Sequence, residues 1–147
     1  MDRSDLEYIR TLNDKIQGQM LRIEYLKSKA LPGAIRYDDT GGNTPTVFDS
    51  LGDLYAEIDK VERKVDALID KREALKNKAL HIVLEVCEDY DERHIIYLRY
   101  LGKDPHTGEN LEWREVIYHV NRLHNIQERK IYQLHHNVVS KIESYKI

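Results

Sequence analysis

The stretch "LGDLYAEIDKVERKVDALIDKREALKNKALHI", residues 51–82, repeats apolar side chains at the spacing of a coiled coil. Two heptad positions carry this seam: Leu51, Ile58, Val65, Arg72 and Ala79 at one, and Leu54, Val61, Leu68, Leu75 and Ile82 at the other. Nine of the ten residues are apolar, and charged residues fill most positions between them. This pattern predicts one long helix. We expect it to begin near residues 47–50 and to end at about Cys87.

A shorter apolar stripe precedes the heptad helix and predicts a second helix over residues 4–29, capped by Ser4. The stripe consists of Ile9, Leu12, Ile16, Ile23 and Leu26. Between the two helices, residues 31–46 hold two prolines and three glycines, which predicts a Gly/Pro-rich loop. The simplest arrangement is an antiparallel helical hairpin, a coiled-coil arm over residues 1–87. The seam at 51–82 is also a candidate homodimer interface, and the pattern does not choose between the two.

Residues 88–147 are expected to form a separate helical domain. In "RHIIYLRYL", residues 93–101, we expect Ile95, Ile96, Leu98 and Leu101 to be buried. After a turn at 102–110, one amphipathic helix is marked by Trp113, Val116, Ile117 and Val120. A second is marked by Ile131, Leu134, Val138 and Ile142. The chain must turn between them, and we place that turn in "NRLHN", residues 121–125. The predicted fold is therefore all-α, a helical arm followed by a helix-turn-helix.

The polar face of the last helix carries side chains suited to reading DNA. At 100° per residue, Arg129, Gln133, His136 and Ser140 point away from the apolar stripe, with Tyr132 and Asn137 beside them. Arginine recognises guanine edges, and glutamine or asparagine recognises adenine edges, in a major groove. The candidate base contacts are therefore Arg129, Gln133, His136 and Asn137, and the candidate phosphate contacts are Arg122, Lys130 and Lys141. The alternative is a polar face that only meets water.

The composition narrows the class of protein. The net charge is −3, which does not favour a polyanion binder, but from Asn121 onward five basic residues stand against two acidic ones. The single cysteine, Cys87, excludes an intramolecular disulfide and fits a reducing compartment. The start "MDRSDLEYIRTL" does not resemble a signal peptide, and no apolar run is long enough to cross a membrane. We expect a cytoplasmic protein without a membrane partner.

Metal binding and catalysis are not predicted. His119 and His124 are five residues apart and His135 and His136 are adjacent, so neither pair shares one helix face. A Gly-rich phosphate loop with its lysine and a nucleophile elbow are both missing from the sequence. We expect a non-enzyme without metal or cofactor, with His135 packed in the core. Six of the seven histidines lie in the C-terminal part, and their charging below about pH 6 would strengthen polyanion binding.

The segments "IIYLRYL", "WREVIYHV" and "ERKIYQLHHNVVSKI" resemble the C-terminal helix-turn-helix of small phage proteins of the ArpU-type late-gene regulator group, itself similar to sigma-factor region 4. The matching residues are Leu98, Arg99, Tyr100, Trp113, Val116, Ile117, Arg129, Ile131, Tyr132, Leu134 and His135. The resemblance implies a phage or prophage transcriptional regulator that binds duplex DNA in a bacterial host cell. The arm would dimerise the protein or dock on RNA polymerase.

Two features depart from that family pattern. The loop "GKDPHTGENLE" is longer than the family's, and "NRLHN" is about three residues longer than its tight, glycine-containing turn. Together with the acidic net charge, they favour an alternative, a non-enzymatic phage adaptor that binds a host or phage protein through the arm.

Overall fold

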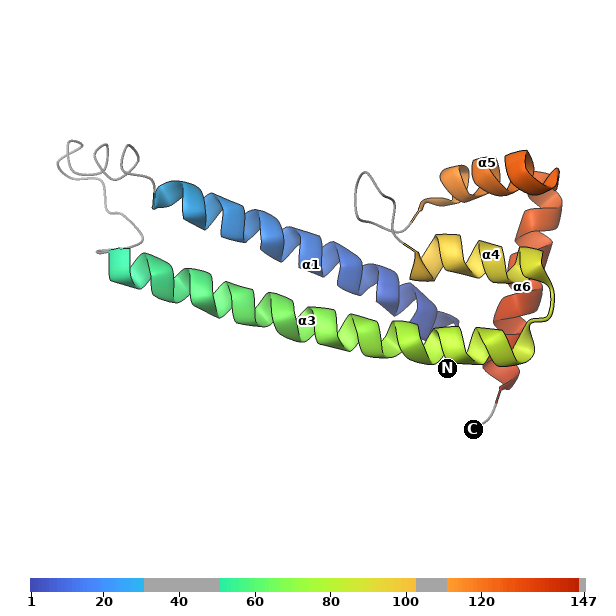
Figure 1. The fold of residues 1–147 in the computed structure, drawn as a ribbon, viewed down its shortest axis with the longest axis horizontal. Helices are drawn as coiled ribbons and strands as arrows, with labels where there is room; N and C mark the ends of the chain where they lie inside the picture. Colours follow the sequence, from blue (N-terminus) through green and yellow to red (C-terminus); the bar gives the residue numbers. More distant parts are fainter. Residues whose placement is uncertain (31–50, 103–110, 146–147) are drawn as a thin grey trace. The chain divides into compact units, whose positions relative to one another are not determined.

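The computed structural model describes residues 1–30, 51–102 and 111–145, and within these ranges every regular element is a helix (Figure 1). The elements are α1 (Arg3–Lys29), α3 (Leu51–Val86), α4 (Tyr90–Ile96), the π-helical turn η1 (Tyr97–Leu101), α5 (Trp113–His124) and α6 (Glu128–Ser144). The predicted all-α class is confirmed. Over the described ranges, none of the helices is apolar for long enough to cross a membrane. The Gly/Pro-rich segment 31–46 lies outside the described residues.

The chain divides into two compact units, and both long helices cross the division. Unit 1 comprises residues 1–14 and 71–147, and unit 2 comprises residues 15–70. This differs from the predicted boundary between residues 87 and 88. The reason is a shared core in unit 1, where the start of α1 and the end of α3 pack with η1 and α6 through Leu6, Ile9, Ala79, Ile82, Tyr100, Val138 and Ile142. The base of the predicted arm therefore belongs to the C-terminal unit.

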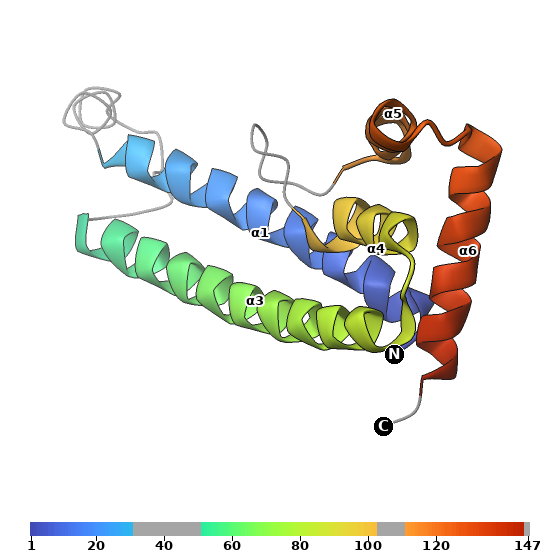
Figure 2. The ribbon, with the colours of Figure 1, turned by 45° about the vertical axis from the view of Figure 1, so that its right-hand side comes forward.

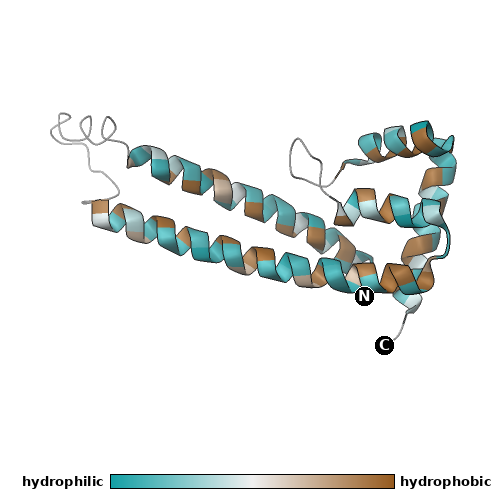
Figure 3. Ribbon diagram, in the orientation of Figure 1, coloured by the Kyte–Doolittle hydropathy of each residue, from teal (hydrophilic) through white to brown (hydrophobic). Residues whose placement is uncertain are grey.

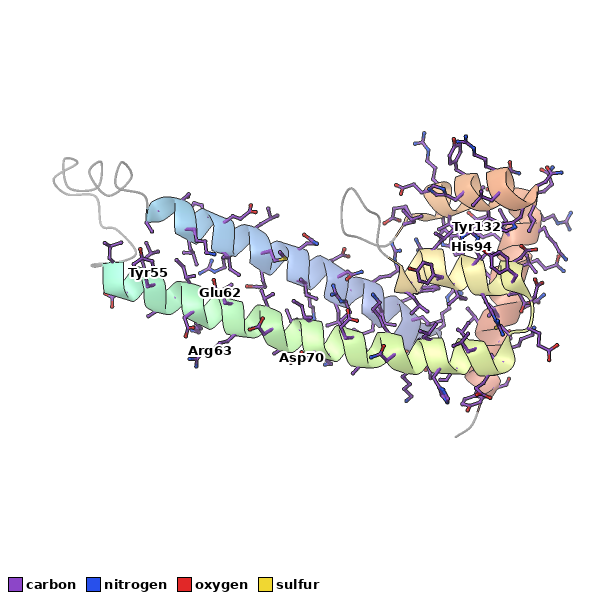
Figure 4. All side chains as sticks on the ribbon, in the orientation of Figure 1. Tyr55, Glu62, Arg63, Asp70, His94 and Tyr132 are labelled. Carbon is purple, nitrogen blue, oxygen red and sulfur yellow. The ribbon has the colours of Figure 1, made fainter. Side chains whose placement is uncertain are left out.

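Unit 2 is a pair of helices, the second part of α1 and the first part of α3. Its core consists of Leu26, Leu54, Ile58 and Val61. Two ion pairs lie beside this core, Arg22 with Glu57 at 3.2 Å and Lys27 with Glu62 at 3.5 Å. Figure 4 shows Glu62 beside this core and Arg63 on the opposite side of α3.

The heptad seam is covered within a single chain. Most of its residues are buried, namely Leu54, Ile58, Val61, Val65, Arg72, Ala79 and Ile82. Of the seam positions, only Leu51 is exposed, at 45%. The seam residues pack against α1 of the same chain. A homodimer through residues 51–82 would compete with this intrachain packing, and it stays a prediction.

Arg72, the polar exception in the seam, has a buried partner in unit 1. Its Nη1 donates to Oδ1 of Asn13 at 2.7 Å, and its Nη2 lies 3.1 Å from Oε1 of Glu73. Asn13 is also buried, at 5% exposure. A buried guanidinium requires such partners because its unpaired burial is costly. The heptad break is therefore a specific polar contact between α3 and α1.

Helix α1 begins earlier than predicted, and Asp2 caps it in place of Ser4. The backbone N–H of Asp5 donates to Oδ1 of Asp2 at 3.1 Å, and that of Asp2 donates to Oδ2 of Asp5 at 2.9 Å. The Ser4 hydroxyl donates to the same Asp2 carboxylate at 2.6 Å. The hydrogen bonds that the Asp2 carboxylate accepts, the Ser4 bond foremost, lower the pKa of Asp2. The arrangement is a reciprocal capping box shifted two residues toward the N-terminus.

A second core in unit 1 joins α4, α5 and α6. It consists of Ile95, Leu111, Val116, Val120, Ile131 and Leu134, with Leu98, Trp113, Ile117 and Ile126 partly buried against it. In Figures 1 and 2, α6 runs crosswise to both α4 and α5. The predicted core residues of α5 therefore meet Ile131 and Leu134 of α6 in this cluster, while Val138 and Ile142 lie in the first core. The burial predicted for Ile131, Leu134, Val138 and Ile142 is confirmed.

The turn between the last two helices is shorter than predicted. Helix α5 continues through His124, so the link to α6 consists of Asn125, Ile126 and Gln127 alone. Asn125 has φ 54° and ψ 42°, the left-handed conformation that asparagine tolerates better than most residues. The Asn121 side chain closes the link by donating to the Ile126 carbonyl at 2.9 Å. The prediction of a lengthened turn at 121–125 was wrong, because "NRLH" stays helical and Asn125 takes the place of a glycine.

Candidate nucleic-acid interface

Helix α6 has one buried face and one exposed face, as its hydropathy colouring indicates (Figure 3). The buried face consists of Ile131, Leu134, His135, Val138, Val139 and Ile142. All seven predicted DNA-contacting residues are exposed: Arg122, Arg129, Lys130, Gln133, His136, Asn137 and Lys141. Six of them lie on α6, and Arg122 lies in the last turn of α5. The sequence pattern therefore assigned both faces of α6 correctly.

The four predicted base contacts form one continuous strip on α6. Arg129, Gln133, His136 and Asn137 follow each other at spacings of four, three and one residues, which keeps them on one side of a helix. Among the described residues, none of these four side chains makes a hydrogen bond or an ion pair. Their donors and acceptors are therefore available to a ligand.

The three predicted phosphate contacts differ in their surroundings. Lys130 is exposed on the first turn of α6. Arg122 donates from Nη1 to the Tyr118 hydroxyl at 2.9 Å, which leaves its other N–H groups unused by that bond. Lys141 instead donates to Oε2 of Glu92 at 2.8 Å, and the Glu92 side chain is only 6% exposed. This hydrogen bond raises the pKa of Lys141.

The Glu92–Lys141 pair attaches the second half of α6 to α4. A carboxylate this deeply buried needs a cation, because an unpaired buried charge is unstable. Lys141 therefore has a structural role that competes with the phosphate contact predicted for it. The sequence contained only a weak signal for this pair, since Glu92 lies three and four residues before the buried Ile95 and Ile96.

A buried polar contact lies against the buried face of α6. The Tyr100 hydroxyl lies 2.8 Å from Nε2 of His135 and 3.2 Å from Oε1 of Glu7, and the Tyr100 and His135 rings are stacked. Burial lowers the pKa of His135 to about 4 and raises that of Tyr100 to about 12. His135 is therefore neutral near pH 7, and the prediction of a core histidine is confirmed.

Trp113 links the start of α5 to the first turns of α6. Its ring meets His135 edge-on at 4.6 Å and lies 5.0 Å from the Tyr132 ring. The Arg99 guanidinium lies 4.8 Å from the Trp113 ring centroid, a cation–π contact. These ring contacts restrict how α6 can rotate about its own axis, and that rotation decides which side chains face outward.

Arg10, far away in the sequence, holds the segment that leads into α5. Its Nη1 donates to the carbonyls of Arg99 and Leu111, both at 3.0 Å, and its Nη2 lies 2.7 Å from Oε1 of Glu112. Sequence analysis missed this residue because its partners lie 89 to 102 positions away. Only the fold brings them together.

Three further side chains meet where α4 begins and α5 ends. Nδ1 of His124 lies 3.2 Å from Oδ1 of Asp91, and Nε2 of His124 lies 3.1 Å from Nδ1 of His94. Burial, followed by the neighbouring His124, lowers the pKa of His94. Sequence analysis compared only histidines close in sequence and did not pair His94 with His124. Within the described ranges, no group of three or more His, Cys, Asp or Glu side chains is arranged to hold a metal ion.

The predicted charging of six histidines near pH 6 requires a correction. Burial keeps His135 neutral to about pH 4 and lowers the pKa of His94. His106 lies outside the described residues. Acid therefore adds less positive charge to unit 1 than a count of histidines implies.

Cys87 does not offer a reactive nucleophile. Its side chain is fully buried, and burial, assisted by Glu92, raises the pKa of its thiol to about 11. Because the thiolate is the nucleophilic form, this thiol is unreactive near neutral pH.

Comparison with known proteins found no family model, no curated protein and no solved structure that matches this chain. The candidate interface therefore rests on the chain's own residues and their geometry.

Proposed function

We propose that the chain binds duplex DNA through α5 and α6 as a helix-turn-helix, with α6 in the major groove, and that it regulates transcription for a phage or prophage in a bacterial host cell. The observation that carries this proposal is the exposed strip of Arg129, Gln133, His136 and Asn137 on a helix whose opposite face is buried. The protein would act by binding, without catalysis.

The link between the two helices supports the assignment. A helix-turn-helix joins its helices at a steep angle through a turn of three or four residues, often with a glycine. Here the link has three residues, and left-handed Asn125 provides the conformation that glycine usually provides. The crosswise course of α6 relative to α5 is the arrangement in which the second helix can enter a groove while the first crosses the backbone (Figure 2).

The chemistry of each exposed side chain indicates the role that we propose for it in this complex. Arg129 would bind guanine, Gln133 and Asn137 would bind adenine, and His136 would donate to or accept from a base edge. Arg122 and Lys130, at the ends of the two helices that meet at the link, would contact phosphates on either side. We leave Lys141 out of the phosphate contacts because its ammonium group neutralises Glu92.

The proposal is tested by selecting binders from a random-sequence duplex library with the full chain. Fluorescence anisotropy at two salt concentrations would then measure the affinity of the selected duplex against random duplex. We expect a preference for the selected duplex, together with an affinity that falls steeply as salt rises. If the chain binds neither duplex at low salt, the proposal is wrong.

The adaptor function remains the second candidate, and a feature of unit 2 favours it. Among its described residues, five large apolar side chains are exposed, Leu21 at 66%, Tyr25 at 58%, Tyr55 at 57%, Met20 at 46% and Leu51 at 45% (Figure 4 labels Tyr55). Exposed aromatic and aliphatic groups are common at protein interfaces. RNA polymerase is one partner that the DNA-binding proposal would predict for this arm. Co-purification with polymerase by the full chain, but not by a variant with Leu21→Ser and Tyr25→Ser, would support that role.

A further inference from the structure

Asp91, His124 and His94 form a continuous chain of polar contacts between the start of α4 and the end of α5. The carboxylate of Asp91 contacts one ring nitrogen of His124 at 3.2 Å, and the other ring nitrogen contacts Nδ1 of His94 at 3.1 Å. The Tyr90 ring lies against both imidazoles, at 5.4 and 5.8 Å between centroids. The two histidines are 30 positions apart in the sequence. This chain of contacts joins the two helices through polar side chains.

The chain of contacts tolerates one extra proton but not two. When both imidazoles are neutral, His124 donates from Nδ1 to Asp91, and its unprotonated Nε2 accepts from Nδ1 of His94. When His124 is protonated, it donates from both nitrogens, and Nδ1 of His94 accepts. When His94 is also protonated, two N–H groups and two positive charges face each other across the 3.1 Å contact. The contact must then open.

The groups around His94 reinforce this limit. On α5, His119 and His124 disfavour its charged form, and on α4 only Asp91 favours it, while burial is the largest effect and also lowers the pKa of His94. Tyr90 contributes an aromatic ring. From α6, the ammonium group of Lys141 is turned to Glu92, so it neither pairs with Asp91 nor replaces its charge. A second proton on the pair therefore requires a pH below the usual range of a histidine.

The position of His124 connects this site to the link before α6. His124 is the last residue of α5, and left-handed Asn125 follows it directly. Releasing His124 from His94 leaves Asp91 as the one member of this chain of contacts that still holds the end of α5 to α4, and so weakens a restraint on the three-residue link. On the basis of the proposed function, that restraint also sets the direction in which α6 enters the groove.

We propose that Asp91, His124 and His94 form a proton-sensitive clasp that fixes the α5–α6 link when at most one of the two imidazoles is charged and loosens it when both are. Acid would then weaken sequence-specific DNA binding, the opposite of the effect expected from added positive charge alone.

The clasp is tested first without DNA. Long-range ¹H–¹⁵N correlation spectra would follow each imidazole of the full chain between pH 8 and 4.5, with exposed His81 as an internal reference. We expect the His94–His124 pair to take up its two protons in coupled steps, the second below the usual range of a histidine. The backbone amides of Asn125 and Gln127 should shift with that second step. Two independent single steps, both within the usual range of a histidine, would overturn the clasp.

Two variants separate the clasp from a general effect of acid. In His94→Gln, a neutral side chain removes the second proton site, so His124 should titrate in one step and the link amides should stay constant. Asp91→Asn removes the charge that favours protonated His124, so the first step should move to lower pH. His81→Gln is the matched control and should leave both steps unchanged. Either clasp variant alone is sufficient if the other does not fold.

DNA binding supplies the second measurement. With a duplex selected at pH 7.5 and salt held constant, acidification to pH 5.5 should weaken specific binding by the wild type by about tenfold, the factor that loss of one hydrogen bond produces. The affinity of His94→Gln for that duplex should change far less. Coupled imidazole steps without DNA binding at any pH would retain the clasp and reject the proposed function. DNA binding together with uncoupled imidazole steps would reject the clasp and retain the proposed function.

Discussion

The Tyr100 hydroxyl lies 2.8 Å from Nε2 of His135, in the interior of unit 1. Tyr100→Phe removes that hydroxyl and leaves a buried imidazole nitrogen without its partner. We expect the free energy of unfolding to fall by roughly 1–3 kcal/mol, the usual penalty for an unsatisfied buried polar group. Urea denaturation would measure it. Tyr118→Phe is the matched control, because Tyr118 is exposed and its hydroxyl bonds only Arg122 among the described residues; an equal loss in both variants would contradict the role of burial.

His135 also makes stability depend on pH. Its pKa is about 4 in the folded chain and about 6.5 when unfolded, so between these values the unfolded state binds a proton that the folded state does not. The stability from neutral His135 is present above about pH 6.5 and is lost as pH falls, by about 2 kcal/mol at pH 5. Urea denaturation of the wild type and His135→Gln at pH 7.5 and 5 should show a smaller loss in the variant. Equal losses would mean that other groups dominate acid unfolding.

Substitutions at Arg129 and Gln133 test DNA recognition separately from folding. Both are exposed, so the double variant Arg129→Ala with Gln133→Ala should change stability by less than about 0.5 kcal/mol per site. Its preference for the selected duplex over random duplex should largely disappear, because base contacts carry the specificity. Lys78→Ala, which also removes an exposed cation from unit 1, is the control and should retain the preference. Anisotropy titrations would measure both, and an unchanged preference in the double variant would exclude α6 as the reading helix.

A substitution at Arg122 tests the phosphate contacts through the salt dependence of DNA affinity. Removing one phosphate-binding cation should reduce the slope of log affinity against log salt by about 0.9 and weaken binding to selected and random duplexes alike. Arg122→Ala should show this pattern, and Lys130→Ala should show it as well. Lys141→Ala serves as the comparison, since Lys141 is paired with Glu92. We expect it to lower the melting temperature with little change in the salt slope.

Asn125 tests the link between α5 and α6. Its φ of 54° is strained for a β-branched residue, so Asn125→Val should cost roughly 1–2 kcal/mol of stability. Asn125→Gly should be tolerated, because glycine adopts this conformation freely. Thermal and urea denaturation of the two variants side by side would show the difference. If valine is accepted as well as glycine, the left-handed conformation does not restrict the link.

Repeating patterns made the helices predictable. The heptad spacing located α3 to within a residue of its observed end, and the stripe of Ile131, Leu134, Val138 and Ile142 identified the buried face of α6 and hence its exposed strip. These predictions succeeded because burial repeats with the period of the helix, and a period is visible in a sequence.

The contacts that position the candidate interface have no such period. Glu92 with Lys141 and Tyr100 with His135 are single pairs between distant segments, and nothing local distinguishes Glu92 from an exposed glutamate. The turn was misplaced for a related reason. "NRLHN" contains no glycine or proline, and only the helical hydrogen bonding of α5 and the conformation of Asn125 show where the helix ends. The division between the two units lies inside the long helices, where the sequence pattern does not change although the packing partners do.

The hydrogen bond between Asn13 and Arg72 joins two residues that stand just before and just after residues 15–70 in the sequence. Unit 2 therefore has the layout of an insertion within unit 1, and the unit that carries α5 and α6 is discontinuous. In evolutionary terms, a lineage could lengthen, shorten or replace residues 15–70 as one block without disturbing the cores of unit 1. A fragment cut at residue 87 would instead lose Leu6, Ile9 and Ile82 from the core that holds α6, so the C-terminal half alone lacks a complete core.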